Sequence, residues 1–210
     1  MITTTKHLQL FLEQIAKILD ITEAQYNQVV QRYTAVSNHL AQEDSELSRF
    51  QPDIKPQGSF LYGTMIRPIF ETDELDVDLV CRLKGKMDSW AQLHLKQAVG
   101  DRIKENADYD RMLDDEGDRC WTLVYSGAFH LDILPAIVGQ EHYTLFEKSY
   151  AGLAGTQVED LAIRMTDRNR INYKWDPNTQ NWPKSNPFGY AKWLKERASL
   201  AFLKGVLLSE

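Results

Sequence analysis

QGSFLYGT, residues 57–64, and LDVDLVCRL, residues 75–83, are the two segments that decide the fold of this 210-residue chain. The second segment alternates acidic and aliphatic residues before it becomes continuously apolar, a pattern that predicts a β-strand with one polar end. Because side chains alternate along a strand, Asp76 and Asp78 point to the same face. We expect these two carboxylates to share a pair of cations.

A third acidic residue, Asp132, lies on the second strand of a predicted hairpin. The segments CWTLVY, residues 120–125, and AFHLDIL, residues 128–134, are rich in strand-forming residues and are joined by Ser126 and Gly127. The aliphatic neighbours of Asp132 face one side of this strand and the acid faces the other. A neighbouring strand could therefore bring further acids beside it.

Three clustered carboxylates repel one another at neutral pH unless cations neutralise them. Oxygen ligands suit Mg²⁺ or Mn²⁺. Two such ions roughly 3.5–4 Å apart can activate an attacking hydroxyl and stabilise a leaving pyrophosphate. The sequence therefore predicts a site in which Asp76, Asp78 and Asp132 hold two Mg²⁺ or Mn²⁺ ions.

The Gly58-Ser59 pair predicts the phosphate-binding part of the same site. Glycine allows a turn tight enough for backbone N–H groups to approach a triphosphate, and the serine hydroxyl is an added donor. A helix that begins just after Ser59 would add its positive end. Each pattern alone is common in loops and half-exposed strands, so the prediction depends on their combination in this order.

The combined motif resembles a known family, the cGAS/DncV-like nucleotidyltransferases (CD-NTases) of bacterial CBASS antiphage systems, within the polymerase-β-like superfamily. The pattern GSxxxGT, then DxD, then a distant Asp is met by Gly58, Ser59, Gly63, Thr64, Asp76, Asp78 and Asp132. A second block, WPKSNPFGYAKWL from Trp182, looks like the stretch that follows the catalytic strands in these enzymes. The resemblance spans roughly residues 57–194.

The resemblance implies an α+β fold with a polymerase-β-like core, in which a mixed central sheet is flanked by helices and preceded by a long N-terminal helix. We expect N-terminal helices over residues 1–52, the nucleotidyltransferase core over 53–165, and an irregular segment with the start of a C-terminal helical domain over 166–210. Family members are generally longer, so we expect this helical domain to be truncated.

The resemblance also implies a reaction: nucleoside triphosphates such as ATP or GTP are joined, with release of pyrophosphate, into a cyclic di- or trinucleotide second messenger. Asp76, Asp78 and Asp132 would hold the metal ions, and Asp132 would help to deprotonate the attacking hydroxyl. An activating protein partner is also expected. The residues expected to contact the nucleotide are Gln57, Gly58, Ser59 and Tyr62.

Two other functions remain open from the sequence. The same metal site could transfer a nucleotide to an RNA end or a protein hydroxyl, as in a toxin system. The chain could also be an inactive nucleotide-binding module, although all three acids are present and a decayed enzyme would be expected to lose at least one.

The composition limits the classes of binding partner and the cellular compartment that we expect for this chain. Hydrophobic residues make up 43% and charged residues 26%, as in soluble globular proteins, so we expect neither disorder nor membrane association. The net charge of −6 and the absence of a Lys/Arg run argue against an obligate nucleic-acid partner. Without a signal-peptide pattern, we expect a cytoplasmic protein. Cys81 and Cys120 lack metal or disulfide spacing, which favours buried thiols.

Periodicity predicts the helices. Apolar residues recur at helical spacing over 8–19, and a capping box that begins at Thr22 starts a second helix that ends near Pro52. We expect a loop-rich interval over 54–70. Further helices are expected over 89–105 and 189–208, with an irregular segment over 167–188 between them.

A few side chains near these motifs have less specific roles. We expect Trp193 to pack in the core. We expect His130 to be a hydrogen-bonded neighbour of the acids rather than a ligand. Arg67 and Lys184 are expected to be solvated surface residues, with neutralisation of phosphate as the alternative. For Trp175, Trp182 and Tyr190, stacking on a nucleotide base is an alternative to packing in the protein.

Overall fold

The centre of the fold is a pair of parallel strands, β2 (Leu75–Leu83) and β4 (Phe129–Val138), in the computed structural model, which describes residues 3–70, 73–138 and 162–207. Their register runs from Leu75 opposite Phe129 to Leu83 opposite Ile137. Both strands become mostly apolar along their length, with Arg82 of β2 as an exception, because their later parts are largely buried. The strand predicted over 75–83 is confirmed at both ends.

Four further strands complete one mixed sheet. Strand β1 (Asp53–Pro56) pairs antiparallel with the outer edge of β2. On its other side, β4 pairs first with β3 (Trp121–Tyr125) and then with β5 (Ile163–Met165), which in turn pairs with β6 (Lys184–Ser185). The predicted hairpin is confirmed as β3 and β4, and the sheet confirms the α+β class.

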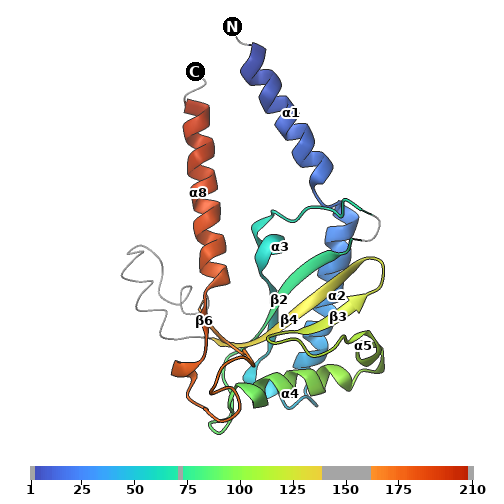
Figure 1. Ribbon diagram of the computed structural model, residues 1–210, viewed down its shortest axis with the longest axis vertical. Helices are drawn as coiled ribbons and strands as arrows, with labels where there is room; N and C mark the ends of the chain where they lie inside the picture. The colour runs from blue at the N-terminus through green and yellow to red at the C-terminus, as the bar shows by residue number, and fades with distance from the viewer. Residues whose placement is uncertain (1–2, 71–72, 139–161, 208–210) are drawn as a thin grey trace.

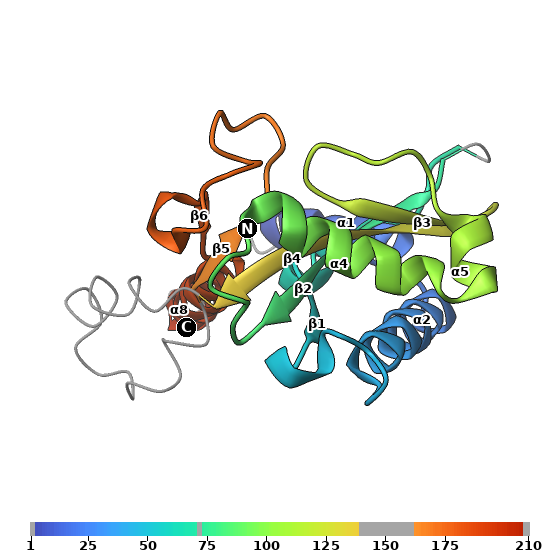
Figure 2. The same cartoon turned by 90° about the horizontal axis from the view of Figure 1, so that it is seen from below.

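Two helices cover one face of this sheet and enclose the main core. Helix α2 (Glu23–Ala41) packs on β1, and helix α4 (Gln92–Lys104) packs on β4 and on α2 (Figure 2). Helix α5 (Ala107–Met112) continues from α4 toward β3. The fully buried core side chains come from α2 (Val29, Val36, Leu40), α4 (Leu95, Val99, Ile103), β2 (Val77, Leu79) and β4 (Leu131, Ile133).

Helices α1 (Thr3–Leu19) and α8 (Pro187–Leu207) project from the same side of this core (Figure 1). Exposed apolar side chains lie along α1, among them Leu8, Phe11 and Ile18. In the described part of the chain, no helix combines the length and the hydrophobicity needed to span a bilayer. The helices predicted over 8–19 and 189–208 are confirmed, and each begins earlier than predicted.

The second helix was predicted to run to Pro52, and this prediction is wrong. The capping box is present, with Thr22 Oγ1 accepting from the Gln25 N–H at 3.2 Å, but α2 ends at Ala41. The chain then turns because Arg102 of α4 donates to Gln42 at 2.8 Å and to Asp44 at 2.7 Å. These bonds redirect the backbone through the short 3₁₀ helix η1 (Ser48–Phe50) toward β1.

The interval 54–70 is less irregular than predicted. It contains most of β1 and also the short helix α3 (Gly58–Tyr62). Strand β1 forms because its backbone pairs with β2. This tertiary contact cannot be predicted from a segment of four residues that ends in proline. The helix predicted over 89–105 is confirmed as α4. The irregular segment 167–188 is confirmed as turns, the 3₁₀ helix η2 (Thr179–Asn181) and β6.

Both cysteines are free thiols, and they differ in burial. Cys81 is buried, as predicted, and burial raises the pKa of its thiol to about 12. Cys120 is only half-buried, and burial again raises its pKa to about 12. The proposed division of the chain at residues 52 and 165 stays a prediction.

Replacement of Gly100 by Ala should destabilise the fold although alanine is the better helix former. A Cβ at Gly100 would overlap the indole of Trp121, whose Nε1 donates to the Lys96 carbonyl at 2.8 Å and so holds the ring in place. Overpacking costs about 1–3 kcal/mol, against about 1 kcal/mol gained from helix propensity. We expect a lower free energy of unfolding in urea denaturation.

The control for this prediction is the same substitution in a Trp121→Phe background. The smaller ring removes the overlap, so Gly100→Ala should then be neutral or stabilising. An equal loss of stability in both backgrounds would contradict the proposed overlap.

Candidate active site

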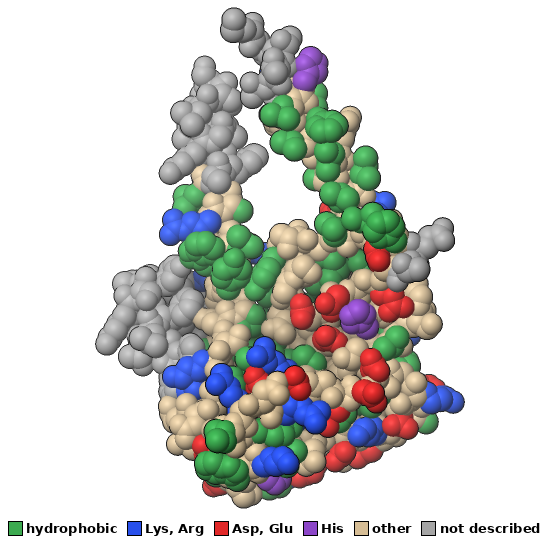
Figure 3. Space-filling model, in the orientation of Figure 1, with side chains coloured by type: hydrophobic (Ala, Val, Ile, Leu, Met, Phe, Trp, Pro, Cys, Tyr) green, Lys and Arg blue, Asp and Glu red, His purple; other side chains and the backbone are tan. Residues whose placement is uncertain are grey.

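Four polar side chains gather where β2 and β4 begin, on the face of the sheet opposite α2 and α4. The parallel register places Asp76 beside His130 and Asp78 beside Asp132. Figure 3 shows acidic side chains around a histidine on this side of the molecule, below the two projecting helices. The sheet thus brings together the three acids that the sequence predicted.

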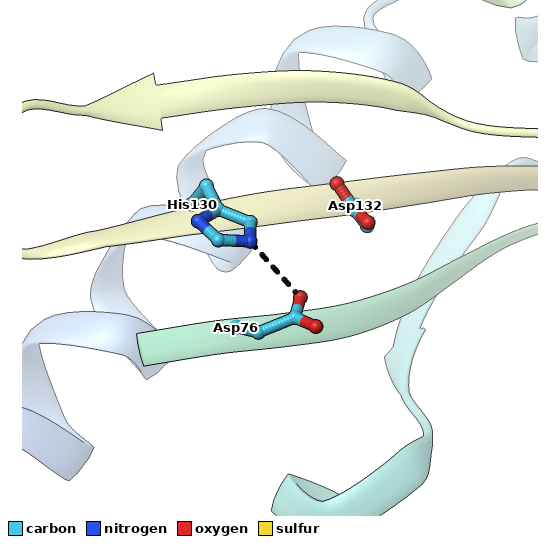
Figure 4. Close-up of side chains that lie close together, drawn as sticks. All are labelled: Asp76, His130 and Asp132. Carbon is cyan, nitrogen blue, oxygen red and sulfur yellow. Dashed lines mark ion pairs between the residues drawn. The ribbon is translucent and has the colours of Figure 1, made fainter. Parts of the chain in front are cut away.

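Asp76, His130 and Asp132 form the tightest part of this group (Figure 4). Each offers one ligand atom, and these atoms lie within 4.8 Å of one another. The His130 Nε2 is 3.2 Å from Asp76 Oδ1. The Asp76 side chain is 61% exposed, so an ion or a substrate can reach it from solvent.

Asp78 lies on the same face but turns toward α3. Its carboxylate lies so close to Gly58 that a Cβ at that position would overlap Oδ2. Burial raises the pKa of Asp78, and the negative charges of Asp76 and Asp132 raise it further, while His130 lowers it. Burial is the main cause of the raised pKa, and repulsion between the neighbouring carboxylates adds to it.

Asp132 is held by the neighbouring strand. The hydroxyl of Thr122, which lies opposite Asp132 in the β3–β4 register, donates to Oδ1 at 2.6 Å. This short bond to a charged acceptor fixes the plane of the carboxylate.

The turn before α3 positions its backbone against β2. The Gln57 N–H donates to the Asp78 carbonyl at 2.8 Å, and Gly58 then adopts a φ of +57°, which favours glycine. The helix begins at Gly58, before Ser59 rather than just after it as predicted. At its other end, Gly63 has a φ of +69° and closes the helix with an N–H bond to the Ser59 carbonyl.

A cavity of about 460 Å³ opens between α3 and the start of β2. Ser59, Thr64, Glu74 and Asp76 are among the residues that line it. The cavity therefore connects the predicted serine to the first acid. Gln57 and Gly58, the residues directly before Ser59, do not line it.

Tyr62 lies outside this cavity and contacts α8 instead. Its ring meets Tyr190 edge-on with centroids 5.2 Å apart, and Tyr190 stacks on Trp193 at 5.6 Å. Burial raises the pKa of Tyr62, and the neighbouring Tyr190 and Asp78 raise it further. These three rings form an aromatic ladder between the acids and the projecting part of α8.

Several secondary predictions need correction. Trp193 was expected in the core, but it is 37% exposed because α8 extends beyond the sheet there. Trp182 is buried and donates to the Asp176 carbonyl, whereas Trp175 is exposed. Arg67 is half-buried rather than solvated, since it donates to the Asp20 carbonyl at 2.9 Å. Lys184 is exposed, as predicted.

The residues present fit divalent cations. Ligand atoms of Asp76 and Asp132, on two adjacent strands, and of His130 lie within 4.8 Å of one another, and the charges of Asp76 and Asp132 also raise the pKa of the nearby Asp78. The site offers Asp76, Asp78 and Asp132 as oxygen ligands and His130 as a nitrogen donor. Such a group can hold Mg²⁺ or Mn²⁺ next to a triphosphate.

Sequence reasoning placed the three acids but missed their supporting residues. Thr122 and Glu74 were not singled out, and His130 was expected only as a hydrogen-bonded neighbour. The relevant signal was the register: DVD and HLD on parallel strands pair Asp76 with His130. That pairing requires knowing that β2 and β4 are neighbours.

The chain is similar to known proteins over most of its length. Residues 2–169 match the model of the Second Messenger Oligonucleotide or Dinucleotide Synthetase domain. A protein from Roseivirga ehrenbergii described as a c-di-GMP synthase is 25% identical over 188 residues, which cover 90% of this chain and 43% of that protein. This chain thus spans less than half of that relative.

Solved structures share the fold. The Bradyrhizobium diazoefficiens CD-NTase CdnG, in complex with GTP, matches with a TM-score of 0.60 at 19% identity, over 85% of this chain and 44% of that one. The Vibrio cholerae DncV cyclic AMP-GMP synthase matches with a TM-score of 0.54 at 12% identity, over 86% and 57%. By its sequence and its fold, the chain belongs to the second messenger oligonucleotide or dinucleotide synthetase family of cGAS/DncV-like nucleotidyltransferases.

Proposed function

We propose that this chain carries the catalytic half of a synthase that condenses nucleoside triphosphates into a cyclic di- or trinucleotide with release of pyrophosphate. The observation that carries the proposal is the convergence of Asp76, Asp78 and Asp132 beside the Gly58-Ser59 turn, in a chain of this family. The R. ehrenbergii relative, described as a c-di-GMP synthase, supports the class of product.

Asp76, Asp78 and Asp132 would hold two Mg²⁺ or Mn²⁺ ions. When bound, such ions supply Lewis-acid stabilisation of the attacking and leaving oxygens. The position of Asp78 against Gly58 places one carboxylate next to the turn where the triphosphate would lie. The acids therefore connect the reacting phosphate to its binding loop.

The chain's own groups would bind and orient the nucleotide. Backbone N–H groups at Gly58 and the hydroxyl of Ser59 would donate to phosphate oxygens. Gln57 would contact the nucleotide from the preceding turn. Tyr62 would lie beside it, where the aromatic ladder with Tyr190 offers a surface for base stacking.

The transfer step needs a group that accepts a proton. The attacking 2′ or 3′ hydroxyl oxygen forms a bond to the α-phosphorus, the bond to pyrophosphate breaks, and the hydroxyl proton passes to Asp132. Thr122 would hold the carboxylate in one orientation through its bond to Oδ1 during this step. A second transfer of the same kind closes the ring.

The biological setting follows from the family. We propose a cytoplasmic role in antiphage defence, in which the product activates an effector. A structure of Escherichia coli MS115-1 CdnC is a complex with HORMA-deltaN, and its fold matches this chain with a TM-score of 0.54 at 16% identity. An activating protein partner is therefore part of the proposal.

The experiment that tests the function follows radiolabelled ATP, GTP, CTP and UTP in turn with Mg²⁺ or Mn²⁺, with Asp76→Asn as the control. Phosphatase-resistant small products, made by the wild-type chain and absent from the variant, would support the cyclic product. Label transferred to added RNA or protein would replace it with macromolecular transfer. If no label is incorporated when the chain is extended to its relatives' length, the proposal is wrong.

A further inference from the structure

His130 lies between two carboxylates, and both of its ring nitrogens face an acid. Its Nε2 is 3.2 Å from Asp76 Oδ1, and its Nδ1 is 3.7 Å from Glu74 Oε2. Glu74 is itself held, since its Oε1 accepts from the Gly127 N–H at 3.0 Å in the β3–β4 turn. The imidazole is 31% exposed, so packing and charge together fix its orientation.

This arrangement gives the two nitrogens different roles. Metal-bound histidines usually present one ring N–H to a carboxylate, which fixes the ring and directs the lone pair of the other nitrogen to the ion. Glu74 is the acid on the Nδ1 side, at 3.7 Å, which is longer than a hydrogen bond. With the proton on Nδ1, the Nε2 lone pair would face Asp76 and Asp132, whose ligand atoms lie within 4.8 Å of it (Figure 4).

We infer that His130 is a direct ligand, through Nε2, of one of the two divalent cations, together with Asp76 and Asp132. The inference rests on the proposed function only in requiring that the site binds such a cation. Without a cation, the 3.2 Å contact between Nε2 and Asp76 Oδ1 is an ion pair or hydrogen bond, and a bound cation would take the place of the proton between these two atoms. Asp78, turned toward Gly58, is then free for the second ion.

A nitrogen ligand changes the metal preference of the site. Imidazole adds more affinity for first-row transition ions, increasingly along the series from Mn²⁺ to Co²⁺, than for Mg²⁺, which prefers oxygen. The mixed ligand set should therefore favour Mn²⁺ over Mg²⁺ more than three carboxylates would. Replacing His130 by Asp should shift the preference toward Mg²⁺.

The test is pulsed EPR of the whole chain loaded with Mn²⁺, which detects ¹⁴N coupling from a coordinated imidazole without turnover. We expect this coupling in the wild-type chain, its loss in His130→Gln, and its retention in His7→Gln, a control at an exposed position on α1. Mn²⁺ affinity, measured by titration, should fall roughly 10- to 100-fold in His130→Gln. Mg²⁺ affinity should fall much less.

Three outcomes would overturn the inference. The first is an absence of ¹⁴N coupling in the wild-type chain, and the second is coupling that survives in His130→Gln. The third is an equal loss of Mn²⁺ and Mg²⁺ affinity in that variant, which would indicate that His130 only positions Asp76. The wild-type spectrum alone tests whether an imidazole coordinates the Mn²⁺ ion, even if the variant does not fold. If ¹⁴N coupling is seen but no nucleotide product is made, His130 is a ligand and the proposed function is wrong. If product is made without ¹⁴N coupling, the proposed function stands and His130 is not a ligand.

Discussion

Asp132→Asn should lower nucleotide incorporation by roughly 10²–10³-fold, the effect typical of removing one preorganised charge-stabilising group from an active site. The amide keeps an oxygen that can accept from Thr122, so the local geometry is retained. It loses the negative charge that would bind a cation and the basicity that would accept the hydroxyl proton. The measurement is the initial rate of pyrophosphate release.

The same variant should be no less stable than the wild-type chain. Asp132 raises the pKa of Asp78 by charge repulsion, and removing the charge relieves it. A thermal melt without added metal should therefore show an unchanged or higher melting temperature. Loss of activity with a lower melting temperature would indicate a folding defect and contradict the assigned role.

Thr122→Val is the graded comparison for Asp132→Asn. This change keeps the carboxylate but removes the 2.6 Å bond that orients it. Because a hydrogen bond to a charged group is worth about 1.5–3 kcal/mol, we expect a loss of roughly tenfold or somewhat more. An effect as large as that of Asp132→Asn would mean that Thr122 does more than orient the acid.

Gly58→Ala should have the second large effect, again on activity more than on stability. The φ of +57° costs an alanine about 1–2 kcal/mol, and its Cβ would overlap Oδ2 of Asp78. The carboxylate must then move away from its place beside the turn. Since a small displacement of a reacting group can cost about 10²-fold, we expect a rate loss of that order.

Gly63→Ala is the matched control because it separates backbone strain from displacement of the acid. Gly63 has a similar φ of +69°, but a Cβ there meets nothing within 4 Å. Both variants should lose about the same free energy of unfolding in denaturant titration, while only Gly58→Ala should lose activity. Equal activity in the two variants would contradict the role given to the Asp78–Gly58 contact.

The sequence predicted the parts of the fold whose signals are local. The alternation and then the apolar run of 75–83 identified β2 to the residue, and the Ser126-Gly127 turn identified the hairpin. The acids followed from the same alternation, because it fixes which side chains share a face. These features need no knowledge of the rest of the chain.

The errors arose where tertiary contacts overrode local signals. The end of α2 at Ala41 depends on Arg102, which is 60 residues away from Gln42 in the sequence and fixes the turn. Strand β1 forms because its backbone pairs with the edge of β2. The exposure of Trp193 depends on what covers α8, and helical periodicity alone does not reveal that.

In the site, too, some features follow from the local sequence and others need the tertiary structure. Asp76, Asp78 and Asp132 could be named from spacing, but the position of His130 opposite Asp76 needs the parallel register of β2 and β4. The contact between Asp78 and Gly58 joins residues 20 positions apart and needs the turn before α3. Motifs thus identified the candidate ligands, and the topology showed which residues lie beside them.

The central claim is that the acids and the Gly58-Ser59 turn together bind a metal–triphosphate. The most direct test is calorimetric titration of the chain with a non-hydrolysable nucleoside triphosphate, with Mg²⁺ and with EDTA, beside Asp76→Asn. The account predicts binding that requires the metal ion and is lost in the variant. Binding of equal strength in EDTA and in Asp76→Asn, or no binding under any condition, would contradict it.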